Sequence, residues 1–67
     1  MSWDQAKIDA AQWLSTIPLP SKLRGEFVDL RPHLGSLKAT GGFREMVKRA
    51  IERELKRRGA MSIIMGE

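Results

Sequence analysis

Apolar side chains recur at three- and four-residue intervals near the start of the chain, which is the spacing of one face of an α-helix. The stripe runs from Trp3 to Ile17. Ser2 can cap its start, because a serine side chain accepts a hydrogen bond from a backbone N–H of the first turn. Pro18 ends it, because the residue before a proline is pushed out of the α region. The pattern predicts a helix at about residues 3–16.

A weaker apolar stripe follows in the next segment. Its members repeat at intervals of four, three and four residues: Leu23, Phe27, Leu30 and Leu34. Gly25 lies inside this stripe and costs about 1 kcal/mol relative to alanine in a helix. Pro32 ends the stripe or tightens its last turn. We therefore predict a second helix at about residues 21–31, opened by Ser21.

A third stripe places its apolar residues on one face of a longer helix: Phe43, Met46, Val47, Ala50, Ile51 and Leu55. Thr40 can cap this helix, and the two glycines that follow it let the chain turn into the first turn. Gly59 is placed to end it, since glycine is favoured just after a helix. We predict this helix at about residues 42–58.

The last segment, residues 60–67, contains β-branched and apolar residues that suit a short strand. Nothing else in the chain has the pattern of a strand, so this tail either folds back over the helices or pairs with another chain. The predicted fold class is all-α, with residues 1–67 as one domain: a small three-helix bundle with a short extended, potentially β, C-terminal tail. A chain of this size is near the lower limit for folding alone.

The net charge of +4 is confined to residues 43–58. Seven of the 12 Lys and Arg lie there against three of the eight carboxylates, while the rest of the chain has five of each sign. The basic side chains project away from the apolar face, as in a helix that lies against phosphates while its other side rests on a core. The residues that we predict to bind nucleic acid are Arg44, Lys48, Arg49, Arg53, Lys56 and Arg57.

An ordinary solvated helix is the alternative interpretation of the same residues. Three pairs have the favourable orientation of glutamate four residues before a cation: Glu45–Arg49, Glu52–Lys56 and Glu54–Arg58. Such pairs account for part of the basic residues as surface ion pairs. Glu54 projects in line with the apolar face, so we expect it either to be solvated beside Arg58 or to be half-buried for a partner's polar group.

Some apolar residues lie off the predicted core stripes. Ile8 and Val28 point away from the stripes of their helices, and the tail adds Met61, Ile63 and Ile64. If these residues were neighbours in the folded protein, they would form an interface. The second functional hypothesis is therefore a protein–protein interaction module: a small adaptor, an inhibitor or a homodimer subunit, with an acidic protein as a partner for the basic helix.

Catalytic and metal-binding signatures are missing from the sequence. The chain has no cysteine and its single histidine is His33, so it cannot assemble a standard zinc site. The usual groupings of acid, base and nucleophile are also missing, and we expect neither an enzyme nor a bound cofactor. No apolar run approaches the ~18–20 residues that cross a bilayer. We expect no membrane partner and a cytoplasmic location.

The confinement of charge to one helix favours a small nucleic-acid-associated regulatory protein. The connection between the second and third predicted helices is too long for a DNA-binding helix-turn-helix. The basic helix also contains no Asn or Gln that could read adenine. We therefore expect binding that is dominated by the phosphate backbone.

Overall fold

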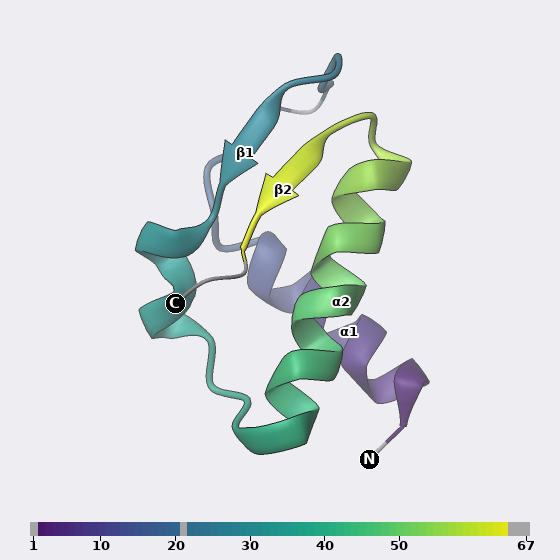
Figure 1. Ribbon diagram of the computed structural model, residues 1–67, viewed down its shortest axis with the longest axis vertical. Coiled ribbons are helices and arrows are strands. Elements are labelled where there is room, and N and C mark those ends of the chain that lie inside the picture. Colours follow the sequence, from purple (N-terminus) through teal and green to yellow (C-terminus); the bar gives the residue numbers. More distant parts are fainter. Residues whose placement is uncertain (1, 21, 65–67) are drawn as a thin grey trace.

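The computed structural model describes residues 2–20 and 22–64. The elements are α1 (Trp3–Leu14), β1 (Phe27–Asp29), the 3₁₀-helix η1 (Arg31–Ser36), α2 (Gly41–Arg57) and β2 (Met61–Ile63). Figure 1 shows α1 lying behind α2, with the two strands side by side next to α2. The described residues form two α-helices and a parallel two-stranded sheet, so the predicted all-α three-helix bundle is wrong.

Helix α1 begins where the sequence predicts. The Ser2 hydroxyl accepts a hydrogen bond from the N–H of Gln5 at 3.1 Å, which satisfies one of the free donors of the first turn. At the other end, the N–H of Ile17 donates to the carbonyl of Leu14 at 3.1 Å, and this turn leads the chain out of the helix ahead of Pro18. The helix therefore ends slightly earlier than predicted.

The helix predicted at residues 21–31 is not present in the described part of that segment. Gly25 has a φ of +74°, in the left-handed region that an α-helix cannot contain. Leu23 and Leu30 are buried, as the helical spacing required, but Phe27 is 71% exposed. The helical spacing of these apolar residues does not reflect a helix, because the backbone of this segment forms its hydrogen bonds with a strand near the other end of the chain.

Strands β1 and β2 pair in parallel, in a register that aligns Phe27 with Met61. The N–H of Met61 donates to the carbonyl of Glu26 at 2.9 Å, and the N–H of Leu30 donates to the carbonyl of Ile63 at 2.8 Å. The predicted tail thus contributes a strand, but its partner belongs to the same chain, which the sequence pattern did not reveal. The last three residues of that tail lie outside the described residues.

Gly59 ends α2 and turns the chain into β2. Its N–H donates to the carbonyl of Lys56 at 3.0 Å, and the N–H of Ala60 donates to the carbonyl of Leu55 at 2.9 Å. These are the two bonds of a Schellman motif, and Gly59 has the required positive φ of +90°. A Cβ at Gly59 would also lie 2.7 Å from the carbonyl oxygen of Leu23. The predicted role of Gly59 at the helix end is confirmed.

The core lies where α1, η1 and the sheet meet α2. Its largest fully buried side chains are Leu30, Val47, Ile51, Leu55 and Ile64. Ala6 and Ala10 are the buried positions in the middle of α1, and their small side chains let the two helices approach closely. Both α1 and β2 pack against α2. The arc of α2 that faces solvent is therefore narrower than the apolar stripe in the sequence predicts.

Candidate nucleic-acid interface

The buried side of α2 includes two of the residues that were predicted to bind nucleic acid. Val47, Ile51 and Leu55 are fully buried, Lys48 is buried beside them, and Arg44 is partly buried. These residues follow one another at three- and four-residue spacing, or are direct neighbours, and so lie on one side of the helix. Part of the predicted basic face therefore lies against the protein.

The guanidinium of Arg44 is bound by the backbone of this chain. Its Nη1 donates to the carbonyl oxygens of Leu37 at 2.7 Å and Ala39 at 3.1 Å, and its Nη2 donates to that of Leu34 at 3.2 Å. These carbonyls belong to η1 and to the irregular loop that leads into α2, where regular backbone pairing ends. Arg44 therefore does not lie on the solvated face where the sequence placed it, and its charge holds this loop against α2.

Lys48 is also turned toward the protein. Its residue is 3% exposed, and its Nζ lies 3.6 Å from Oε2 of Glu45. A buried ammonium group needs polar partners because desolvation is costly, and this carboxylate is one of them. The pair takes the place of the predicted Glu45–Arg49 pair. We therefore leave Lys48, like Arg44, out of the candidate surface.

Four basic side chains lie on the opposite, exposed arc of α2 and form what we term the outer cation row: Arg49, Arg53, Lys56 and Arg57. At 3.6 residues per turn they fall within an arc of about 100° and extend about 12 Å along the helix. Among the described residues, Arg49 and Lys56 have no hydrogen bond or ion pair. Glu45 and Glu52 lie beside the row and Glu54 binds Arg57 at its end, so its four cations face three carboxylates. The row is basic but not uniformly so.

The carboxylate of Glu54 binds Arg57, the last cation of this row, on the side of α2 that faces α1. The Glu54 side chain is 22% exposed, and its carboxylate accepts hydrogen bonds from Arg57 and, at 3.2 Å, from Nε of Arg58. The bond from Arg57 is the main cause that lowers the pKa of Glu54, and the same bond raises the pKa of Arg57. The predicted Glu54–Arg58 pair is confirmed, whereas Glu52–Lys56 is not among the ion pairs of the described residues.

The five residues predicted as a partner-binding patch do not form one surface. Ile64 is buried in the core, and Val28 is partly buried against it. Ile8 is half exposed, but it lies on α1, behind α2 in Figure 1. Met61 and Ile63 alternate along β2 and therefore point to the same face of the sheet. Only this last pair remains together on the strands.

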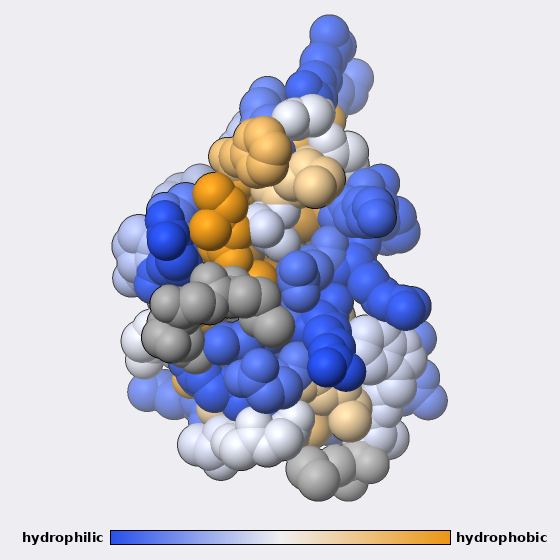
Figure 2. Space-filling model, viewed as in Figure 1, coloured by the Kyte–Doolittle hydropathy of each residue, from blue (hydrophilic) through white to orange (hydrophobic). Residues whose placement is uncertain are grey.

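Phe27 joins that pair on the sheet. The register places it beside Met61, and the two residues are 71% and 52% exposed. With Ile63 they form what we call the sheet patch, part of the orange and tan area that covers the strands in Figure 2. Sequence reasoning missed Phe27 because its spacing from Leu23 and Leu30 assigned it to the core face of a helix. Only a strand prediction for residues 27–29 would have placed Phe27 on the sheet.

No protein-family model, curated protein or solved structure matches this chain. Within residues 2–20 and 22–64, no three His, Cys, Asp or Glu side chains gather where they could hold a metal ion. Over the same residues, the helices are too short or too polar to span a bilayer. The outer cation row and the sheet patch each support a functional proposal.

Proposed function

We propose that this protein binds nucleic acid through the outer cation row of α2 and acts as a nucleic-acid-associated regulatory protein. The observation that carries the proposal is the division of α2: its apolar residues are buried on two sides, while four cations are exposed together on the remaining arc. Lys and Arg side chains arranged along one exposed arc can contact successive phosphates and release their counterions. The cytoplasmic location predicted from the sequence belongs to this proposal.

The binding that this surface supports is independent of base sequence. Helix α2 contains no Asn or Gln, so the bidentate contact that reads adenine is not available from it. Glu45 and Glu52 beside the row weaken the attraction to phosphate. We therefore expect a dissociation constant in the range of non-specific binding, about 10⁻⁴ to 10⁻⁶ M at physiological salt.

Fluorescence anisotropy with labelled duplex and single-stranded oligonucleotides tests this proposal. With three or four phosphate contacts, duplex affinity should fall about 40- to 150-fold between 50 and 200 mM salt, because each contact adds about 0.9 to the salt slope. Lys56→Glu should weaken binding at least about fivefold. Binding that does not change with salt, or no binding at 50 mM, would contradict the proposal.

Lys38→Glu is the matched control for Lys56→Glu. It makes the same change in net charge, but Lys38 lies in the loop before the first turn of α2, whereas Lys56 lies in the last turn. The two positions are separated by most of the length of α2, about 25 Å at 1.5 Å per residue. The control should bind within about twofold of the unchanged protein. Equal losses in the two variants would mean that net charge, and not the outer cation row, determines binding.

The sheet patch supports a second candidate function, protein–protein interaction. The backbone groups of Glu26 and Leu30 bond to β2, so those of Phe27 and Asp29, which alternate with them, point away from β2. An outward strand edge beside exposed apolar side chains is a surface on which another chain can add a strand. A homodimer is the simplest form of this candidate.

Light scattering of the concentrated protein tests the second candidate. If the sheet patch is a dimer interface, the molar mass should be twice that of the chain, and Phe27→Lys should return it to that of a monomer. Ile8→Lys, which places the same charge on α1, should leave the dimer intact. A monomeric unchanged protein would remove the homodimer from consideration.

A further inference from the structure

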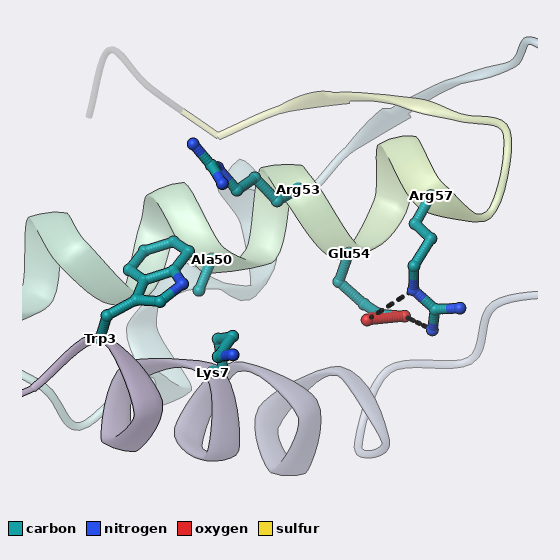
Figure 3. A pocket seen from close by; sticks show the side chains of 6 residues that line it. All are labelled: Trp3, Lys7, Ala50, Arg53, Glu54 and Arg57. Carbon is teal, nitrogen blue, oxygen red and sulfur yellow. Dashed lines mark hydrogen bonds and ion pairs between the residues drawn. The ribbon is translucent and has the colours of Figure 1, made fainter.

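A hollow of about 300 Å³ lies between α1 and α2, next to the outer cation row. It is lined by Trp3 and Lys7 from α1 and by Ala50, Arg53, Glu54 and Arg57 from α2. We call it the Trp3 groove. Figure 3 shows the indole of Trp3 at one end, the ion pair of Glu54 and Arg57 at the other, and Lys7 between them. The groove therefore combines an aromatic ring with three cations.

The charges of the Trp3 groove favour an anionic ligand. Three cations face one carboxylate, that of Glu54, and this carboxylate already accepts hydrogen bonds from Arg57 and Arg58. Lys7 lies 3.4 Å from a carboxylate oxygen of Asp4, but both side chains are largely exposed, so a ligand phosphate can compete for this lysine. The groove keeps a net positive charge that the protein's own carboxylates do not cancel.

The aromatic ring of the Trp3 groove is also placed beside a cation. The guanidinium carbon of Arg53 lies 5.2 Å from the centroid of the Trp3 ring. An arginine and an aromatic side chain that lie together form the kind of platform on which unpaired bases stack in proteins that bind single strands. A base stacked on this platform would have its phosphate within the reach of Lys7 and Arg57.

A second hollow of similar volume, about 330 Å³, provides an internal comparison. It is bordered by Trp13, the other tryptophan of the chain, but this residue is buried and its indole N–H donates to the hydroxyl of Ser36 at 2.9 Å. Its lining includes a single cation, Lys38, and a carboxylate, that of Asp9. Of these two hollows, only the Trp3 groove combines a partly exposed tryptophan ring with several cations.

We propose that the Trp3 groove takes one unstacked nucleotide of a single-stranded nucleic acid, with its base against Trp3 and Arg53 and its phosphate at Lys7 and Arg57. This inference rests on the proposed function and adds that the preferred form is single-stranded, because a base inside a duplex is stacked on its neighbours and cannot reach the ring. The volume is at the lower end of ligand sites and suits one nucleotide. The outer cation row then contacts the neighbouring phosphates.

Anisotropy with a labelled oligothymidylate and with a duplex of the same length tests the inference. Trp3→Leu should weaken single-strand binding about tenfold, the usual effect of losing one stacked base. Trp3→Phe should retain most of the affinity, and duplex binding by Trp3→Leu should stay within about twofold. If Trp3→Leu binds the single strand as tightly as the unchanged protein does, the groove proposal is wrong while the proposed function stands. If the unchanged protein binds neither form, both are wrong.

A surface variant covers the case in which Trp3→Leu does not fold. Lys7→Glu should weaken single-strand binding at least about fivefold, while Lys38→Glu changes it less than about twofold. Thymidine monophosphate, titrated against the tryptophan fluorescence of the unchanged protein, distinguishes a free nucleotide from a strand. Binding of the mononucleotide much weaker than that of the oligonucleotide supports the proposal. Equal affinities would overturn it in favour of a mononucleotide site.

Discussion

Both sides of α2 carry Lys and Arg side chains, but the environments of these side chains differ. On the side that faces η1 and the sheet, Arg44 donates three hydrogen bonds to backbone carbonyls and Lys48 is buried beside Glu45. On the outer side, Arg49 and Lys56 are exposed. Lys48 and Arg49 are adjacent in the sequence and differ completely in environment. The net charge of a helix therefore does not show which of its cations a ligand can reach.

The difference between the two sides arises from what packs against each. The inner side meets an irregular loop whose carbonyl oxygens need donors, and a guanidinium supplies several donors at once in a fixed geometry. The outer side meets solvent over most of its arc, apart from the contact between Arg53 and Trp3. The inner cations stabilise the fold, and the outer ones are available for binding.

Removing the charge on the inner side should have the largest effect on stability. Arg44→Met retains much of the apolar stem but leaves three carbonyl oxygens without the guanidinium, and we expect a loss of about 2–3 kcal/mol. Arg49→Met, the matched change on the outer side, should alter stability by less than about 0.5 kcal/mol. Urea unfolding followed by circular dichroism measures both. Equal losses in the two variants would contradict the division of α2 into two sides.

A side chain at Gly59, where the chain turns from α2 into β2, should have the next largest effect on stability. Gly59→Ala places a Cβ at a φ of +90° and 2.7 Å from the carbonyl oxygen of Leu23, and we expect a loss of about 2 kcal/mol. Gly42→Ala is the control, because Gly42 has no other atom within 4 Å of such a Cβ and lies in the first turn of α2. It should be neutral or stabilise the protein by up to about 1 kcal/mol. A Gly59→Ala protein as stable as the Gly42→Ala protein would show that the turn tolerates a side chain.

The smallest expected effect concerns the ion pair at the end of the outer cation row. Because Arg57 lowers the pKa of Glu54 in the folded protein, the pair stabilises the fold above the ordinary glutamate pKa of about 4.5. This contribution is lost as the pH falls through the lowered pKa. Glu54→Gln should therefore cost about 0.5–1 kcal/mol at pH 7 and progressively less below pH 4.5.

Unfolding at a series of pH values measures this difference. Asp29, whose pKa is lowered to about 2 by hydrogen bonds from Arg31, has a dependence of the same sign. It is present in both proteins and cancels when they are compared. A gap between Glu54→Gln and the unchanged protein that stays constant down to pH 3 would mean that Glu54 acts through packing and not through its charge.

Local signals in the sequence predicted the start of α1 and the end of α2 correctly, but they wrongly predicted a side-chain cap at Thr40 and did not predict the pairing of β1 with β2. Ser2 and Gly59 act through backbone groups within a few residues, so their roles could be read from the chain itself. Phe27 could not be placed, because its position depends on a strand that follows α2. Arg44 was assigned to solvent for a related reason. A helical wheel shows where a side chain projects but not whether a loop with unpaired carbonyls lies there.

The central claim, that the outer cation row binds nucleic acid while the inner cations do not, is tested most directly by a salt titration. The slope of log affinity against log salt would be measured for a single-stranded oligonucleotide with the unchanged protein and with Arg49→Ala/Lys56→Ala. We predict that the double variant loses about 1.4 from this slope, or about 0.7 for each phosphate contact, and that its unfolding midpoint in urea stays the same. An unchanged slope would contradict the account.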